Sequence, residues 1–297
     1  MSAPVITIGL PVYNAAPFLE DALRSVFAQT FTSWELLAVD DGSTDDGLRR
    51  LQNLGDPRVR VLSDGRHRGL AARLNQVVRE ARGQFIARMD ADDLIHPERL
   101  ARQLDFLQQH PELDAIGCGV IVLGRNLEPV GMRDLPPEHE QICARLPGPM
   151  GLLHASAFSR AAWSRRHPYK EDCACEDQDL WFSTYRTSRF GNLPAPLYFY
   201  RELESFSAGK HTRAKLDFIE VLWRWRVHFG RFRTLRMIAR QLLAAGIYAL
   251  ASFAGLAPRL LRRRNRPLDA ASREQFQSAL ARIRATPLPL RKVGALS

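Results

Sequence analysis

Apolar and polar positions in the first 125 residues form alternating blocks with the spacings of strands and helices. Short apolar runs predict buried strands at Val5–Val12, Trp34–Val39, Val59–Leu62, Phe85–Met89 and Ala115–Leu123. Apolar residues three and four positions apart predict helices between them, at Phe18–Gln29, Asp45–Leu54, Leu70–Ala81 and Pro97–His110. This alternation predicts an α/β fold with a mostly parallel sheet flanked by helices.

The pattern becomes irregular after about Arg125, where proline-rich segments interrupt it. A helix over Glu176–Thr187 and a strand over Leu197–Tyr200 are predicted there, and the chain is predicted to be helical from about Lys210. We therefore expect one domain over 1–209, with halves 1–124 and 125–209. A helical C-terminal extension follows over 210–297.

Charge divides the chain at the same place. From Lys210 onward there are 19 Lys and Arg against 4 Asp and Glu, a net charge of +15, whereas the whole chain carries +10. The preceding residues hold 23 bases and 28 acids, a net charge of −5. A basic extension on an acidic body indicates binding to an anionic surface, either a membrane or a nucleic acid.

An uncharged, mostly apolar run of 16 residues, Leu242–Ala257, lies within this extension. As a helix it would be about 24 Å long, shorter than the roughly 30 Å of a bilayer core. We therefore favour a helix that lies in the plane of an anionic membrane, supported by Arg262–Arg264 and Arg266. A membrane span and a helix packed on the protein's own body remain as alternatives.

Neither the N-terminus nor the cysteines indicate export. Met1–Pro4 run directly into the first strand without the pattern of a signal peptide. The cysteines follow no zinc spacing, which favours reduced thiols: Cys118, Cys143, Cys173 and Cys175. We expect a cytoplasmic protein that is peripheral at the inner face of the membrane.

Two acidic clusters follow predicted strands: Asp40-Asp41, and Asp90 with Asp92 and Asp93. Carboxylates packed this closely repel one another unless a cation or hydrogen-bond donors meet them. The carboxyl ends of strands in an α/β sheet are also where ligands bind. The clusters therefore predict a site for a divalent cation and a phosphate-bearing ligand, with helix capping as the alternative.

The residue types suggest separate tasks within such a site. Asp41 can accept a hydrogen bond from a pyrimidine N–H. Asp40 lies nearby, where it can accept hydrogen bonds from the nucleobase or from ribose hydroxyls. Asp90 and Asp92, two positions apart in an extended segment, point the same way and can meet one Mg²⁺ or Mn²⁺. Arg68 can pair with phosphate.

Arg73 has the same capacity for phosphate pairing, although a solvated surface arginine is the alternative for both residues. Glu176 and Asp177 begin a predicted helix, where a carboxylate can act as a general base toward a hydroxyl group. Stabilisation of acids by the helix dipole is the alternative for this pair. Asp93 is expected to cap the turn that follows it.

Several segments, taken in order and with their spacing, resemble family 2 glycosyltransferases. They are Val5–Asn14, Ser25–Thr30, Val39–Asp45, His67–Asn75, Ala87–Asp93 and Glu176–Trp181. The likeness is strong from Val5 to about Gly117. It implies a nucleotide-diphosphosugar-binding GT-A fold and an inverting transferase, with 1–124 binding the donor and 125–209 facing the acceptor.

The resemblance also implies roles for single residues. Pro11 and Tyr13 belong to the nucleotide pocket, Asp90 binds the sugar nucleotide, Asp92 binds the metal and Asp177 is the base. The remaining candidates are Asp179 and Glu176 as substitutes for the base, His154 on the acceptor side and His211 as a metal ligand. Asn75-Gln76-Val77 departs from the family, which often has a glycine two residues after the asparagine.

We therefore expect a metal-dependent, inverting glycosyltransferase. Its donor would be a nucleotide-diphosphosugar, a UDP-sugar first, and its acceptor a lipid-linked or cell-surface glycan. The Gln-x-x-Arg-Trp motif of processive synthases is absent from the sequence, which favours single additions. A nucleotidyltransferase on a similar core and a nucleic-acid-binding protein are the alternatives. The apolar run beside the arginines argues against nucleic acid as a partner.

Overall fold

The structure is a computed structural model that describes residues 3–124, 126–201, 208–253 and 265–291. In these residues one sheet of nine strands runs through the molecule in the order β3-β2-β1-β4-β8-β6-β9-β5, with β7 beside β6. The strands are β1 (Ile6–Val12), β2 (Trp34–Asp40), β3 (Val59–Ser63), β4 (Phe85–Arg88), β5 (Leu94–Ile95), β6 (Ala115–Leu123), β7 (Pro129–Arg133), β8 (Phe158–Arg160) and β9 (Phe190–Arg201).

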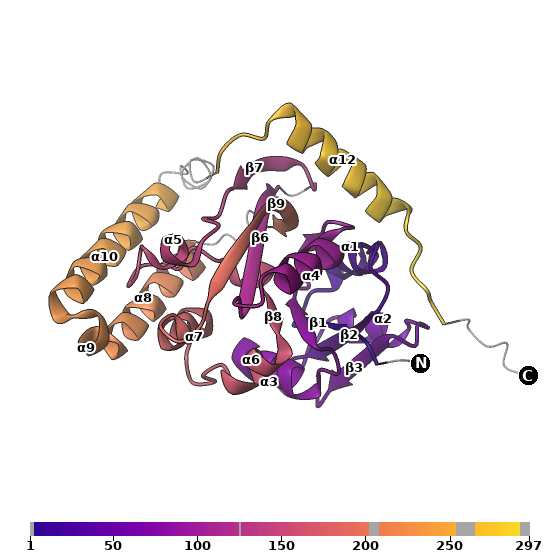
Figure 1. Ribbon diagram of the computed structural model, residues 1–297, viewed down its shortest axis with the longest axis horizontal. Helices are drawn as coiled ribbons and strands as arrows, with labels where there is room; N and C mark the ends of the chain where they lie inside the picture. Colours follow the sequence, from indigo (N-terminus) through magenta and orange to yellow (C-terminus); the bar gives the residue numbers. More distant parts are fainter. Residues whose placement is uncertain (1–2, 125, 202–207, 254–264, 292–297) are drawn as a thin grey trace, which may run out of the picture.

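Helices flank this sheet and extend beyond it (Figure 1). They are α1 (Ala16–Phe27), α2 (Gly47–Gln52), α3 (Leu70–Glu80), α4 (Arg99–Gln109), α5 (His139–Cys143), the 3-10 turn η1 (His154–Ser156), α6 (Ala161–Arg166), α7 (Glu176–Thr184), α8 (Ala208–Arg224), α9 (Arg226–Phe229), α10 (Arg231–Phe253) and α12 (Ala270–Ala285). The predicted α/β class is confirmed. The predicted strands and helices of the first 124 residues all form, with ends shifted by a few residues.

The first four strands pair in parallel, as the alternating pattern predicts. Residues of β2 and β6 are buried along their whole length, because helices cover both faces of the sheet. Gly9 lets α3 approach β1 closely, since a Cβ there would lie 2.4 Å from a methyl carbon of Val77.

The irregular half completes the sheet in a way that its sequence pattern does not predict. β8 has only three residues, yet it inserts antiparallel between β4 and β6 and joins the two halves of the sheet. The strand predicted at Leu197–Tyr200 is the end of the longer β9, which pairs in parallel with β6. The half over 125–209 is therefore built into the same sheet as the first half.

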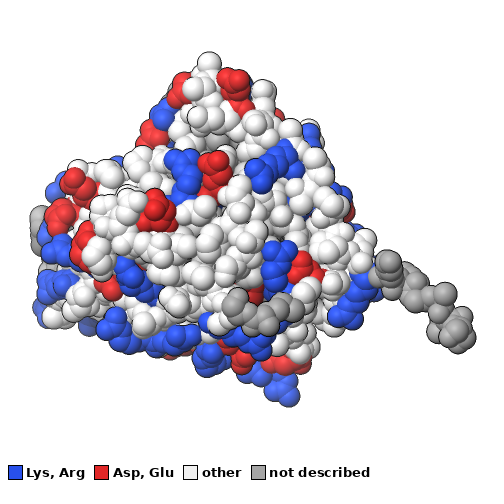
Figure 2. Space-filling model, turned by 45° about the vertical axis from the view of Figure 1, so that its right-hand side comes forward, with Lys and Arg blue, Asp and Glu red and all other residues white. Residues whose placement is uncertain are grey.

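In its described residues the C-terminal extension is mostly helical, as predicted, and it packs on the body through α8, α9, α10 and α12. Phe218 of α8 lies 6.1 Å, ring to ring, from Phe182 of α7. Phe276 of α12 is buried against Phe199 of β9, with a ring separation of 5.0 Å. Figure 1 shows α12 on the opposite side of the molecule from α10. Basic side chains also gather along the lower margin of the face drawn in Figure 2.

Only part of the predicted membrane segment can be described, since residues 254–264 lie outside the described residues. Among the described helices, none has both the length and the apolar character needed to cross a bilayer. Arg266, which we expected to support membrane binding, instead forms an ion pair with Asp134, and its backbone pairs with Met132 of β7.

Candidate active site

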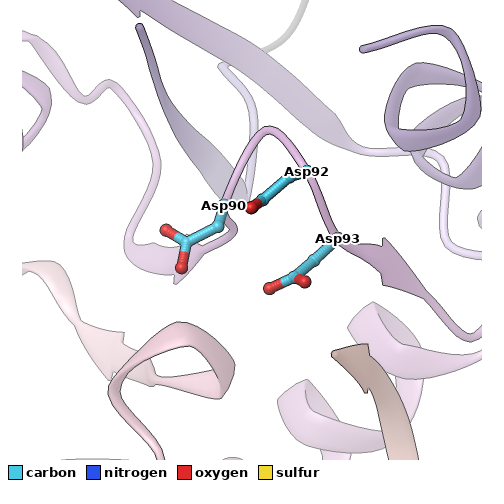
Figure 3. Close-up of side chains that lie close together, drawn as sticks. All are labelled: Asp90, Asp92 and Asp93. Carbon is cyan, nitrogen blue, oxygen red and sulfur yellow. The ribbon is translucent and has the colours of Figure 1, made fainter. Parts of the chain in front are cut away.

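An acidic turn between β4 and β5 forms the centre of the candidate site. Asp90, Asp92 and Asp93 follow the carboxyl end of β4, and their side chains lie on the same side of this turn (Figure 3). One carboxylate oxygen from each lies within 4.8 Å of the others. The sequence prediction that these strand-end carboxylates gather at one point is therefore confirmed.

The three carboxylates have different surroundings. Asp90 is partly exposed, and one of its oxygens lies 2.8 Å from a guanidinium nitrogen of Arg88. Asp93 is fully buried and accepts hydrogen bonds from the hydroxyl of Tyr198 and the backbone N–H of Arg201, both at 2.8 Å. The expectation that Asp93 caps the following turn is wrong, because its carboxylate ties the turn to β9.

This cluster is electrostatically unfavourable without a cation. Burial and the neighbouring Asp90 raise the pKa of Asp92 to about 6. Burial, Asp92 and Asp90 also hold the pKa of Asp93 well above its ordinary value. A set of three oxygen donors with excess negative charge fits Mg²⁺ or Mn²⁺, both of which prefer carboxylate ligands. Asp92 and Asp90 are the residues that would hold it, since Asp93 already has two donors.

The predicted nucleotide residues surround the ends of β1 and β2. Pro11 pairs with Val39 near the ends of these strands. The ring of Tyr13 is half exposed and stacks on His67, with 4.3 Å between ring centroids. This pair forms an aromatic surface just after the end of β1, of a kind on which a nucleobase can stack.

Asp41 organises the segment that follows β3. It is buried and accepts hydrogen bonds from the backbone N–H groups of Arg68 (2.7 Å) and Gly69 (3.0 Å). Nε of Arg73 donates to it at 2.8 Å, and Nδ1 of His67 lies 2.8 Å away. These contacts place the aromatic pair and the predicted phosphate-binding arginines around one carboxylate.

Asp40 organises its own turn in the same way. It accepts hydrogen bonds from the backbone N–H groups of Gly42 and Ser43 (3.2 Å each) and from the hydroxyl of Ser63 (2.8 Å). Gly42 adopts a φ of +73°, and a Cβ there would lie 2.8 Å from the carbonyl carbon of Arg66. Only glycine meets both requirements without strain.

The two candidate phosphate-binding arginines differ in accessibility. The Arg73 guanidinium is 1% exposed and donates to Asp41, Asp64 and Gln76 and to the carbonyl of Arg66. Arg68 has a 52% exposed side chain and one contact to Asp64 at 2.7 Å. Arg68 can turn toward a ligand, whereas Arg73 supports the loop. A direct ligand contact by either arginine stays a prediction.

Glu176 and Asp177 begin α7, as the sequence predicts. Glu176 is largely buried, with Oε1 3.9 Å from Nδ1 of His154, and Nε2 of His154 lies 2.8 Å from the hydroxyl of Tyr169. Burial and then the charge of Asp177 raise the pKa of Glu176 to about 7. Asp177 is half-buried and accepts a hydrogen bond from the backbone N–H of Gln178.

Asp179, the other substitute for the base, is placed elsewhere. Its buried carboxylate accepts hydrogen bonds from Nε1 of Trp225 (2.9 Å) and from Arg224 (3.2 Å). It therefore anchors α8 to α7, and assigning it to catalysis is inconsistent with this geometry. The side chain of His211 lies outside the described residues.

Comparison with known proteins decides the family. A sequence profile described as glycosyl transferase family 2 matches residues 7–162, which is more than half of the chain. The chain belongs to glycosyl transferase family 2. EpsE of Bacillus subtilis (strain 168) is 30% identical over 207 residues, covering 68% of this chain and 74% of EpsE. The family match favours glycosyl transfer over the nucleotidyltransferase alternative.

Solved structures share the fold of this family 2 glycosyltransferase. TarS of S. aureus, residues 1–349 in complex with UDP-GlcNAc, aligns with a TM-score of 0.59 at 20% identity, covering 95% of this chain and 81% of that chain. The mannosyltransferase PcManGT of Pyrobaculum calidifontis, in complex with GDP-Man and Mn²⁺, aligns with a TM-score of 0.57 at 19% identity. That alignment covers 96% of this chain and 87% of PcManGT. The predicted GT-A fold is confirmed.

The structure adds residues of this glycosyltransferase that sequence reasoning did not select. Arg88 is buried beside Asp90, and its Nε has no hydrogen-bond partner among the described residues. Burial lowers the pKa of Arg88, but the charges of Asp90 and other acids, Glu176 among them, raise it overall. Arg88 and His67 lie inside segments that carry the family resemblance. Tyr169 and Tyr198 lie in the irregular half, and although Tyr198 falls in the predicted strand Leu197–Tyr200, no motif marks either side chain as part of the site.

We expect Glu176→Gln to change how stability depends on pH. The pKa of Glu176 is raised from 4.5 to about 7, so its stabilising contribution is complete below pH 4.5 and is lost as pH rises through 7. Between these limits the wild-type chain should lose about 3 kcal/mol that the variant keeps. Urea unfolding across this pH range measures the difference. Parallel pH profiles for the two proteins would contradict the assignment.

Proposed function

We propose that this family 2 glycosyltransferase transfers a sugar from a nucleotide-diphosphosugar to a hydroxyl of a lipid-linked or cell-surface glycan, with inversion and with a divalent cation. One observation carries the proposal. Arg88 lies 2.8 Å from Asp90 of the acidic turn and also interacts electrostatically with Glu176 at the start of α7, although the turn and α7 are far apart in sequence. The candidate cation ligands and the acids of α7 are therefore gathered near the same arginine.

Each residue has a place in this reaction. Pro11 and the Tyr13–His67 pair would hold the nucleobase of the donor. Asp40 and Asp41 would position the surrounding loops and offer hydrogen-bond acceptors to the nucleobase and the ribose. Arg68, with Arg73 behind it, would face the diphosphate. A cation held by Asp92 and Asp90 would neutralise the leaving diphosphate.

Asp177 would accept the proton of the acceptor hydroxyl as the new glycosidic bond forms. Its half-buried position leaves the carboxylate accessible to a substrate. Glu176 is less suited to this role, because its side chain is largely buried beside His154. A single in-line displacement with one base inverts the anomeric centre.

The ligands of the related structures support the donor class. TarS was solved with UDP and with UDP-GlcNAc, and PcManGT with GDP-Man and Mn²⁺. A thermal-shift screen of UDP- and GDP-sugars with and without Mn²⁺ tests the proposal. We expect a UDP-sugar to stabilise the protein only when Mn²⁺ is present. The proposal fails if no nucleotide sugar stabilises it under either condition.

We also propose that the enzyme works in the cytoplasm, peripheral to the membrane, through α10. Leu243 and Leu250 are 67% and 73% exposed, and they lie seven residues apart on one face of this helix. Arg236 lies seven residues before Leu243 and is also exposed. An apolar face that continues from a basic one is typical of a helix lying in an anionic membrane interface.

Replacing Leu243 and Leu250 together with glutamine should release the enzyme from membranes, because it removes the apolar contact. Fractionation after salt and alkaline carbonate washes measures this, with Leu216→Gln, on α8, as the exposed control. Truncation before α10 is a poorer test, since it would also remove α12 from the core. Membrane retention of the double variant equal to the wild type would contradict the proposal.

A further inference from the structure

A second charged site lies away from the acidic turn, between α10 and the loop that follows α5. A groove of about 470 Å³ opens there. Its polar lining is entirely basic and consists of Arg145, Arg233, Arg236 and Arg240. The remaining lining residues are apolar, glycine or proline, and no acid is among them. None of these arginines forms an ion pair with any residue that the structure describes.

The two walls of this groove are fixed against each other. Leu146, at the base of the loop, is buried in the same apolar cluster as Met237 of α10. A Cβ on Gly148 would lie 3.2 Å from the terminal carbon of Met237, so the loop and the helix are in close contact. The loop closes on itself through a hydrogen bond from the Gly148 N–H to the carbonyl of Arg145 at 2.7 Å.

The arrangement of the arginines suits a compact anion. Arg233, Arg236 and Arg240 stand on one side of α10, three and four residues apart. Arg145 faces them from the loop. Four unpaired guanidinium groups around one groove repel one another, and an anion between them relieves this repulsion. Guanidinium forks match the oxygens of phosphate, so a phosphate group is the ligand class that the lining fits.

The source of that phosphate follows from the rest of α10. Arg236, Leu243 and Leu250 are in line on the helix, so the groove opens beside the exposed apolar face. A free phosphate would leave the exposed apolar face of α10 uncovered. A bilayer would cover this face and present its lipid phosphates beside the arginines of the groove. We propose that this groove binds the phosphate group of a membrane lipid. This proposal rests on the proposed membrane association and makes it more specific.

The test uses the full-length protein and vesicles of three compositions. These are phosphatidylcholine alone, and phosphatidylcholine mixed with phosphatidic acid or with phosphatidylserine to the same surface charge. Phosphatidic acid exposes a phosphate monoester that several guanidinium groups can bind. We expect the wild-type protein to prefer phosphatidic acid over phosphatidylserine in co-sedimentation. Inorganic pyrophosphate should compete with this binding.

Charge-reversal variants separate the groove from general attraction. Arg145→Glu and Arg236→Glu should each weaken binding to phosphatidic acid vesicles about tenfold and remove the preference over phosphatidylserine. The matched control is Arg231→Glu, which makes the same change at an exposed position of α10 outside the groove lining. This control should keep the preference. Nucleotide-sugar binding, measured in parallel, shows that each variant is folded.

Each contrary outcome has a separate meaning. The groove proposal is overturned if Arg231→Glu loses the preference as fully as Arg236→Glu, or if both groove variants keep it. Pyrophosphate binding without any lipid preference would assign the groove to a soluble anion and overturn the lipid proposal. Failure of the wild-type protein to bind any vesicle would overturn membrane association itself, whereas vesicle binding without a preference would overturn the groove alone.

Discussion

Asp92→Ala is expected to abolish sugar transfer and the metal dependence of nucleotide binding. Asp92 lies in the acidic turn, where three carboxylates come within 4.8 Å of one another. Removing it takes away a predicted cation ligand that no neighbour can replace, since Asp93 is already bound to Tyr198 and Arg201. Calorimetry with a nucleoside diphosphate, with and without Mn²⁺, measures the loss.

Stability provides the internal check on this variant. Burial and Asp90 raise the pKa of Asp92 to about 6, so its ionised form opposes folding at neutral pH when no cation is bound. The melting temperature without metal should therefore stay the same or rise in Asp92→Ala. Asp105→Ala, an exposed acid on α4, is the control and should behave as the wild type. Unchanged metal-dependent affinity in Asp92→Ala would remove Asp92 from the ligand set.

Asp177→Asn should reduce turnover by on the order of 10²-fold or more while leaving donor affinity nearly intact. A base acts in the transition state, so its loss lowers kcat more than donor binding. The substitution preserves shape, and the asparagine oxygen can still accept from the Gln178 N–H. Steady-state kinetics combined with donor calorimetry separate the two quantities.

A nearby acid serves as the control for this experiment. Asp172 is 77% exposed and lies five residues before Asp177, and its contact with Lys170 is long, at 3.9 Å. Asp172→Asn should leave kcat unchanged. A parallel fall of donor affinity and turnover in Asp177→Asn would make Asp177 a binding or folding residue.

The first 124 residues could be predicted well because their elements are local and periodic. Apart from the two-residue β5, which the pattern does not predict, the strands there are mostly apolar and the helices carry an apolar stripe, so burial follows largely from spacing. The position of the acidic turn also follows, since the parallel strands β1, β2 and β4 end on one edge of the sheet. Asp90 and Asp92 could therefore be selected without the structure.

The second half could not be predicted in this way. β8 has three residues, which is too short for a periodic signal, and it forms because the edges of β4 and β6 are both available to it. Asp179 shows the same limit for a single side chain. Its sequence position is that of a catalytic acid, but the packing of α8 on α7 supplies Trp225 and Arg224 as partners.

The sequence alone determined the fold class, the family and the acidic residues that mark the site, because these depend on short-range patterns and ordered motifs. Tertiary structure decided which carboxylates remain available. Asp92 stays half-buried at the turn, whereas Asp93 and Asp179 are held by donors from distant elements. It also decided that Arg145 meets the arginines of α10 across one groove. Contacts between residues far apart in the chain depend on packing, which local sequence spacing does not encode.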